Sequence, residues 1–432
     1  MGLSGQNIHE YIITKIIRRR KKTALSNKTE FKMSLKTRLA VVFTVMCCSL
    51  SSANALELTV WEDYTKGAGL AQAISAFTNE TGIDVKVEEN TYIYALQKMR
   101  LDGPVGRGPD VILLPNDQLG MAAKEGMIDP VYLTDEEKAK YPDNVIDAVS
   151  IDQIQYAIPK SIETLAIFYN KKYLSKPFDS IDSYIKYTKL EKENGRNGFV
   201  AKFDDLFYSM PMLSSYGAYV FGKNKVGAVN VNDVGLDGHA AVKAITKIKE
   251  YYDEKLIPSV INGLNGAPNL VEMFCQGRAA ATILGSWDVG TAKKSRIDFA
   301  TAPLPVNSEG KQMAGFLGVR GFAISHWAKD YDAAVKLAKF LTQDRYSKSR
   351  FKLTGEIPAS LKLLDDPDIL NDKYANAFIQ QAKLAEAMPS VSEMHKFWLP
   401  FSNQLQRIFK GKIPVADGLH EVVYNVKSSY QK

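Results

Sequence analysis

The chain has 432 residues, and its 55 Lys and Arg against 48 Asp and Glu give a formal net charge of +7. That surplus lies in residues 1–55, which hold ten Lys and Arg against two Asp and Glu, so residues 56–432 carry 45 basic and 46 acidic side chains. Nucleic-acid binding depends on clustered positive charge, so this near-neutral remainder gives no support for a nucleic-acid partner. Its 377 residues are enough for two lobes with separate cores.

Residues 33–55 have the pattern of a cleavable export signal. Two basic residues, Lys36 and Arg38, precede a 12-residue apolar run, and Ala53-Asn54-Ala55 follows it. The run is too short for a membrane-spanning helix, which needs about 20 residues. We therefore expect cleavage after Ala55, and we expect residues 1–32 to be a mis-annotated or disordered extension that takes no part in the fold.

Cysteine usage agrees with export to a bacterial periplasm. A lipoprotein signal is the alternative, but Met46 stands before Cys47 where a small residue is expected. Only Cys275 remains after residue 55, which rules out an intramolecular disulfide and a cysteine metal cluster there. Exported proteins without disulfides are common in that compartment and unusual among small secreted eukaryotic domains.

After residue 55 the hydrophobic pattern predicts strands alternating with helices. Strands are expected at 56–60, 83–88, 110–115 and 279–284, and helices at 70–77, 117–125, 334–341 and 419–426. The run at 110–115 is apolar throughout, as in parallel strands that are buried on both faces. This order predicts an α/β fold built from parallel sheets. The chain is too long for one sheet and has no linker, so we expect it to cross more than once between two lobes.

Signatures of catalysis are weak. Gly67-Ala68-Gly69 and Glu88 imitate a dinucleotide-binding fingerprint, but Gln72 stands where the third glycine belongs, so we expect a loop that lets a helix start. None of the five histidines is paired at metal-ligand spacing. The acid pair Asp204-Asp205 could flank a glycosidic bond, although solvated loop acids are the commoner explanation. We expect no catalytic residues, no cofactor and no metal.

Several aromatic residues lie beside turn signals and carboxylates. Phe207 and Tyr208 follow the acid pair, Trp287 lies in GSWDVG, and Trp398 lies in EMHKFWLP. Each one alone is explained equally well as packing. Together they predict a pocket with flat apolar walls and nearby carboxylates. Such a pocket suits a sugar, because aromatic rings cover the C–H faces and charged side chains bind the hydroxyls.

Residues 56–432 resemble the extracellular solute-binding proteins that feed ABC importers, and within them the maltose and maltodextrin group. The segments that carry the resemblance are GPDVILLPNDQLG (108–120), AIPKSIETLAIFYNKKYL (157–174), FCQGRAAATILGSW (274–287) and AMPSVSEMHKFW (387–398). The resemblance implies the two-lobed periplasmic binding protein fold. Each lobe would be a mostly parallel sheet flanked by helices, with the ligand cleft between the lobes.

The resemblance also implies how the chain is divided. The N-terminal lobe would comprise 56–161 and 322–366, and the C-terminal lobe 164–315 and 367–432. Hinge crossings are expected at 162–164, 316–321 and 362–367. Closure about these hinges would bury the bound sugar, as is general for periplasmic binding proteins.

Carried over by motif, the family's ligand contacts fall on ten residues: Asp63, Lys66, Asp117, Glu163, Asp205, Phe207, Tyr208, Trp287, Met388 and Trp398. The resemblance makes Asp117 a hydroxyl-binding carboxylate, and Trp287 and Trp398 stacking residues. Four departures fall within this set's motifs. Thr65 stands for an acid, Leu114 for a tryptophan, Gln118 for an arginine and Leu399 for a tyrosine, so the preferred glucan is open.

The function that the resemblance implies is that of a periplasmic binding protein for maltose or maltodextrins. It would be a monomer without enzymatic activity, and its closed form would dock on the membrane subunits of an ABC importer. Two alternatives stay open from the residues alone. One is a binding protein for another oligosaccharide, a cyclic glucan or a polyol, and the other is an exported glycosidase.

Overall fold

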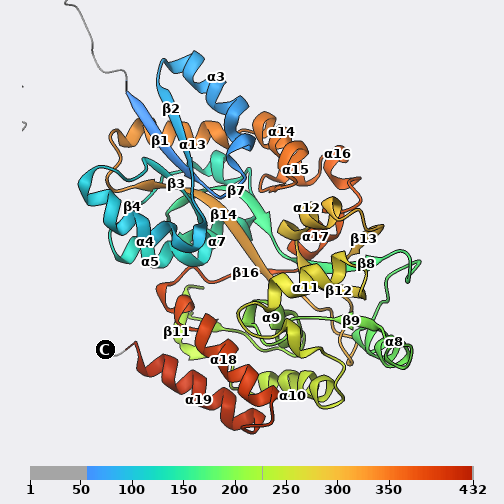
Figure 1. Cartoon of the computed structure of the whole chain (residues 1–432). Helices are drawn as coiled ribbons and strands as arrows, with labels where there is room; N and C mark the ends of the chain where they lie inside the picture. The colour runs from blue at the N-terminus through green and yellow to red at the C-terminus, as the bar shows by residue number, and fades with distance from the viewer. Residues whose placement is uncertain (1–55, 226, 431–432) are drawn as a thin grey trace, which may run out of the picture. The chain divides into compact units, whose positions relative to one another are not determined.

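The computed structural model describes residues 56–225 and 227–430, so the predicted export signal and the 1–32 extension lie outside the described residues. Leu56–Lys432 forms one compact unit. Two separate sheets organise it, and Figure 1 shows helices packed around both. The predicted α/β class is confirmed.

The larger sheet contains the first strand of the unit and has the order β15-β7-β14-β3-β1-β2, with β4 and β16 also paired to β14. Its strands are β1 (Glu57–Glu62), β2 (Asp84–Glu89), β3 (Val111–Pro115), β4 (Ile128–Asp129), β7 (Ala157–Glu163), β14 (Phe316–Ser325), β15 (Ile357–Pro358) and β16 (Glu386–Ala387). All ten residues of β14 are buried, which explains its apolar sequence and makes its single arginine conspicuous.

Helices cover both faces of the larger sheet. They are α3 (Ala71–Thr81), α4 (Tyr92–Asp102), α5 (Asn116–Lys124), α7 (Asp143–Ala148), α13 (Tyr331–Leu341) and α14 (Asp344–Thr354). Helix α3 buries Phe77 against Phe340 of α13, with ring centroids 5.4 Å apart. It ends at Gly82, whose φ of 71° is the left-handed conformation that glycine adopts without strain.

The smaller sheet has the order β13-β8-β12-β9. Its strands are β8 (Leu165–Asn170), β9 (Asn197–Val200), β12 (Ala279–Gly285) and β13 (Phe299–Ala302). Helices beside it are α8 (Ile181–Glu193), α11 (Gly266–Cys275), α12 (Val289–Lys294) and α17 (Ala375–Ala382). Phe168 of β8 is fully buried and contacts the rings of Phe274 and Phe299, so one aromatic core joins the sheet to α11.

A third group of helices packs together next to the smaller sheet (Figure 1): α9 (Leu206–Ser215), α10 (His239–Asp253), α18 (Trp398–Phe409) and α19 (Val415–Ser428). Short elements complete the fold: the hairpins β5 (Ser150–Ile151) with β6 (Ile154–Gln155) and β10 (Phe221–Lys223) with β11 (Val229–Val234), helices α6 (Asp135–Lys138), α15 (Leu361–Leu364) and α16 (Pro367–Leu370), and 3-10 turns η1 (Gly67–Leu70), η2 (Gly103–Val105), η3 (Ser259–Ile261), η4 (Ser286–Asp288) and η5 (Ser392–Lys396). No helix among the described residues is long and apolar enough to cross a membrane.

The chain passes between the two sheets at neighbouring points. Strand β7 ends in the larger sheet at Glu163, and β8 begins in the smaller sheet at Leu165. Thr164 lies between them and donates from Oγ1 to the carbonyl of Phe316, the first residue of β14, at 2.8 Å. Residues 386–397 return to the larger sheet, where β16 pairs with the start of β14 and η5 packs on α5. These strand ends bring distant segments together at one place.

The strands and helices predicted from periodicity are all present, but the prediction of mostly parallel sheets was wrong. Pairs β1–β2, β1–β3, β14–β16 and β9–β12 are parallel, whereas β14 runs antiparallel to both β3 and β7, and β8 antiparallel to both β12 and β13. The physical reason is the crossing of the chain. A strand that enters a sheet from the other sheet's side runs against the strands that reach it through local βαβ connections.

Candidate ligand-binding site

A cavity of about 570 Å³ lies where the chain passes between the two sheets. The loop after β1, the end of β7, η4, β14 and the segments 351–357 and 368–378 contribute to its lining. Four of the ten residues predicted from the sequence line this cavity: Asp63, Lys66, Glu163 and Trp287. Its size lies within the range that small-molecule sites occupy.

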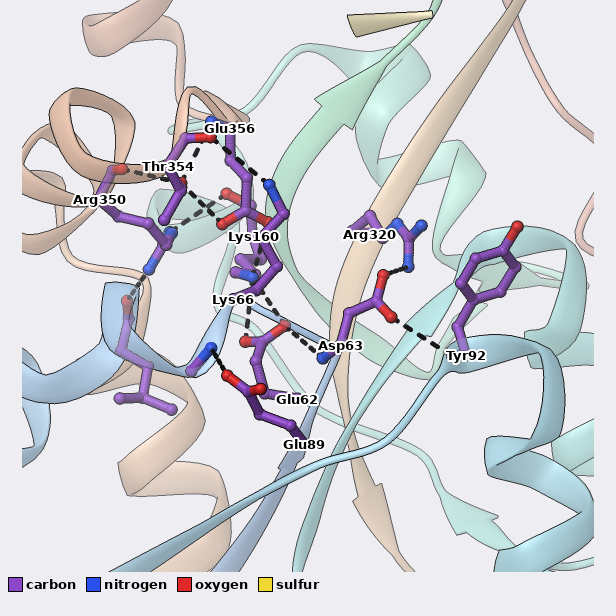
Figure 2. A network of polar contacts seen from close by, with 12 residues as sticks. Glu62, Asp63, Lys66, Glu89, Tyr92, Lys160, Arg320, Arg350, Thr354 and Glu356 are labelled. Atoms are coloured by element: carbon purple, nitrogen blue, oxygen red, sulfur yellow. Dashed lines mark hydrogen bonds and ion pairs between the residues drawn. The ribbon is translucent and has the colours of Figure 1, made fainter. Parts of the chain in front are cut away.

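Arg320 on β14 is held between two carboxylates at the cavity wall, as Figure 2 shows for its Asp63 side. Its Nε donates to Oε1 of Glu163 at 3.0 Å, and its Nη1 lies 3.1 Å from Oδ2 of Asp63. The guanidinium lies over the ring of Tyr92, 4.5 Å from the centroid. Burial alone would lower the pKa of Arg320, but the charges of Glu163 and Asp63 outweigh it and raise the pKa. The cation is therefore permanently charged and fixed in place.

A second buried cation, Lys160 on β7, lies beside Glu62 and Glu356 (Figure 2). Its Nζ lies 3.0 Å from Oε1 of Glu62 and 2.8 Å from Oε1 of Glu356, which itself lines the cavity. Burial raises the pKa of Glu62. Burial also acts on Glu356, but the charges of Lys160 and Arg350 outweigh it there and lower the pKa to about 2. These contacts tie β1, β7 and the loop before β15 together around the cavity.

The loop between β1 and α3 is fixed by the carboxylate of Glu89. That carboxylate accepts from the backbone N–H of Thr65 at 3.0 Å and from that of Gly67 at 2.8 Å. Nζ of Lys66 lies 3.5 Å from the carbonyl oxygen of Thr354. Glu88, the acidic residue of the apparent dinucleotide fingerprint, accepts instead from the Trp61 indole at 3.0 Å. Gly67 and Gly69 thus lie in a loop that starts a helix, as expected. The backbone N–H of Gly67 already donates to Glu89.

An aromatic cluster borders the cavity, with Phe207 at its centre. The Phe207 ring centroid lies 5.7 Å from Trp287, 5.9 Å from Phe316 and 6.5 Å from Trp398. Trp287 remains 39% exposed, so one of its surfaces is open to a ligand. A Cβ on Gly285 would lie 2.2 Å from the Trp287 ring, so only glycine at 285 lets the indole pack against the end of β12. The structure thus brings three predicted aromatic residues together.

Asp117 lies in the first turn of α5, where the helix dipole favours a negative charge. Its Oδ2 accepts from the indole N–H of Trp398 at 3.1 Å. Burial raises the pKa of Asp117, and this hydrogen bond opposes the increase. The neighbouring Asn116 donates to the carbonyl of Met388 at 2.5 Å, which holds the predicted rim residue beside α5. These residues adjoin the aromatic cluster but do not line the cavity itself.

The acid pair Asp204-Asp205 has structural partners, so the explanation as solvated loop acids was wrong. Asp204 is fully buried, lies 2.8 Å from Lys202 Nζ and accepts from the N–H of Gly263. Asp205 caps α9, because its Oδ1 accepts from the N–H groups of Phe207 at 2.9 Å and Tyr208 at 3.4 Å. Burial raises the pKa of Asp205 and that of Tyr208, which is 7% exposed.

Asp288 follows Trp287 directly and is almost completely buried. Its Oδ2 accepts from the N–H of Gly285 at 3.2 Å. Burial raises the pKa of Asp288 to about 7, this hydrogen bond opposes the increase, and the charge of Glu163 adds to it. The carboxyl that accepts from Gly285, the residue against which the Trp287 indole packs, therefore has its pKa near neutral pH.

Two residues in the site were missed by the motif comparison. Arg320 was assigned only to an expected hinge, although one charged side chain within the apolar stretch FLGVRGFAIS is a signal of a buried functional or structural group. Tyr374 lines the cavity between two lysines, with Nζ of Lys293 4.5 Å and Nζ of Lys373 4.6 Å from its ring centroid. No local pattern distinguishes Tyr374, because only one of these lysines, Lys373, is near it in the sequence.

Comparisons with known proteins agree on one kind of protein. Residues 72–377 match the family of bacterial extracellular solute-binding proteins. The galactooligosaccharide-binding protein of Bacillus subtilis (strain 168) is 35% identical over 379 residues, covering 87% of this chain and 90% of that protein. The maltodextrin-binding protein MdxE of the same organism is 28% identical over 393 residues, covering 88% and 93%. A solved cyclo/maltodextrin-binding protein complexed with maltotetraose has a TM-score of 0.80 at 30% identity, covering 88% of this chain and 99% of that one.

The chain belongs to the bacterial extracellular solute-binding protein family. The resemblance found in its motifs is confirmed, and so is the two-lobed fold of its structural neighbours. The proteins of this family bind solutes and are not enzymes, so the glycosidase alternative loses its support. Among the described residues, no group of His, Cys, Asp and Glu could hold a metal ion.

Replacing Lys160 with Met tests the buried ion network. The substitution leaves the carboxylates of Glu62 and Glu356 without their shared cation, so we expect a loss of about 3–5 kcal/mol in the free energy of unfolding. Urea denaturation at pH 7 measures it. The control is Lys249→Met, which breaks the helical pair with Asp253 and should cost less than about 1 kcal/mol. Equal stability of the two variants would contradict the assigned role of the network.

Replacing Asp288 with Asn tests whether the pKa of this buried carboxyl is raised in the folded protein. A folded pKa of about 7, raised above the usual 3.8, means that the folded protein binds more protons between these values. The contribution of Asp288 to the free energy of unfolding is thus complete below about pH 4. This contribution, roughly 4 kcal/mol, is lost as the pH rises through 7. Asn does not titrate, so the free energy of unfolding of D288N should fall less than that of the wild type between pH 5 and 8. Parallel pH profiles in urea denaturation would show that the pKa is not raised.

Proposed function

We propose that this protein is the substrate-binding component of an ABC importer and that it binds maltose or maltodextrins between its two sheets. The observation that carries the proposal is the half-exposed Trp287 indole, which shares one cavity with Asp63, Glu163 and Arg320. Indole offers an apolar face to a pyranose ring, and the charged groups accept and donate hydrogen bonds to its hydroxyls. Solved relatives complexed with maltotetraose and maltose support this ligand class.

The ten sugar contacts predicted from the sequence remain part of this proposal. Asp63, Lys66, Glu163 and Trp287 would contact the sugar directly from the cavity lining. Asp117 and Trp398 would join them once the lobes move, because their mutual hydrogen bond lies next to the same aromatic cluster. Closure would take place about the crossings at 162–164, 316–321 and 362–367, and it requires the sugar to bind the closed arrangement better than the open one. The closed form, as a monomer, would then dock on the importer's membrane subunits.

A galactooligosaccharide is the second candidate ligand. The relative with 35% identity binds galactooligosaccharides, whereas the maltodextrin-binding relative is 28% identical. The replacements at Leu114, Gln118 and Leu399 favour a redirected preference, because each removes an aromatic or arginine contact that the maltodextrin group carries. Galactooligosaccharides therefore belong in every ligand panel.

Calorimetric titration of residues 56–432 tests the proposal. The panel comprises maltose, maltotriose, longer maltodextrins, a cyclodextrin, a galactooligosaccharide and an unrelated sugar. We expect saturable binding of maltodextrins.

Trp287→Ala and Trp398→Ala should bind about 10- to 100-fold more weakly, because each removes a stacking or supporting indole. Trp327→Ala is the control, because this partly buried indole packs on Gly103 outside the cavity lining. Normal binding by both test variants would refute the aromatic assignment, and exclusive binding of galactooligosaccharides would move the ligand to the second candidate.

Export to the periplasm with cleavage after Ala55 is the second part of the proposal. A streptococcal relative is a lipoprotein, which makes the cysteines at 47 and 48 the competing processing site. Mass spectrometry of the mature protein distinguishes the two outcomes. We expect an N-terminus at Leu56, because the small residues of Ala53-Asn54-Ala55 match signal peptidase. An N-terminal diacylated cysteine would contradict this.

A further inference from the structure

We propose that Arg320 is a ligand-binding residue that gives the cavity its preference for uncharged sugars. This inference rests on the proposed function and adds to it a residue and a chemical selection. The guanidinium would donate to neighbouring hydroxyls of one sugar ring, while the carboxylates of Asp63 and Glu163 accept from them. Uronic acids and other anionic sugars would be excluded from this position.

The first support is that Arg320 has donors to spare. Its Nε is used by Glu163, and its Nη1 lies beside Asp63 without forming a hydrogen bond of good geometry. The side chain is 90% buried and lines the cavity, and the unpartnered buried donor is Nη1. A buried donor without a partner lowers stability, because its lost hydration is not replaced. A ligand hydroxyl placed in the cavity would remove that cost.

The second support is that the guanidinium plane is fixed before any ligand arrives. Glu163 holds Nε at 3.0 Å, and the ring of Tyr92 lies 4.5 Å from the guanidinium carbon. Asp63 is itself oriented, because its Oδ1 accepts from the N–H of Tyr64 at 2.9 Å. A planar, fixed fork of donors matches two adjacent hydroxyls of a pyranose better than a point charge does. Little conformational freedom would be lost on binding.

The third support is the charge balance. One guanidinium faces two carboxylates, Asp63 and Glu163, so the group carries a net negative charge. Over the whole cavity lining five carboxylates face four cations: Asp63, Glu163, Glu356, Asp368 and Asp372 against Lys66, Lys293, Arg320 and Lys352. At this position an additional carboxylate on the ligand would meet repulsion from Asp63 and Glu163, because Arg320 is already paired with both of them. Uncharged hydroxyls, in contrast, both donate to the carboxylates and accept from Arg320.

Arg320→Lys tests the role of the fork while keeping the charge. Titrated with the sugar that the wild type binds most tightly, R320K should bind about 10- to 100-fold more weakly, the effect of losing hydrogen bonds from a charged donor. The matched control is Arg350→Lys. Arg350 is also buried, but it donates to the Leu341 carbonyl and Ser347 hydroxyl at 3.0 Å each and does not line the cavity. R350K should bind like the wild type, even if it melts at a lower temperature.

A second measurement needs no variant. The wild type is titrated with the same sugar after its terminal CH₂OH group has been oxidised to a carboxylate. We expect the affinity to fall at least about tenfold, because the acid meets two carboxylates beside one shared cation. Undiminished binding by folded R320K, or equal affinity for the acidic sugar, overturns the inference while the proposed function stands. A wild type that binds no sugar at all refutes both.

Discussion

The site depends on the compensation of two buried cations, each of which lies between two carboxylates. Lys160 is shared by Glu62 and Glu356, and Arg320 by Asp63 and Glu163. Glu62 and Asp63 are consecutive in the chain, so the end of β1 contributes one acid to each group. A buried charge is tolerated only when its partners offset the loss of hydration. The two groups therefore fix the ends of β1 and β7 against the middle of β14, near the point where the chain passes between the sheets.

This arrangement is compatible with the proposed closure of the two lobes. The ion groups belong to the larger sheet and the loops around it, whereas Trp287 extends from the end of β12 in the smaller sheet. Contacts across the two parts include the Thr164–Phe316 hydrogen bond, the Asp117–Trp398 hydrogen bond and the rings around Phe207. A ligand that lies between Trp287 and Arg320 would touch both parts at once. Its binding energy is then available to favour one lobe arrangement over another.

Much of the fold was predictable from the sequence, because strands such as β3 and β12 and helices such as α3 and α13 have a strong hydrophobic period. Strand direction was not predictable in this way. Periodicity describes burial within one strand, and the antiparallel course of β14 follows from where the chain crosses. The residues of the site also differ in how far the sequence could predict them. Trp287 and Glu163 lie in motifs that the sequence displays, whereas the role of Arg320 depends on partners 157 and 257 positions away in the chain.

We propose that an uncharged oligosaccharide lies in the cavity between the Trp287 indole and the Arg320 guanidinium. A crystal structure of residues 56–432 with the tightest-binding sugar of the ligand panel tests it most directly. We expect one pyranose ring against Trp287, with its hydroxyls in hydrogen-bond contact with Arg320, Asp63 and Glu163. A sugar bound elsewhere on the protein, with this cavity filled by water, would contradict it.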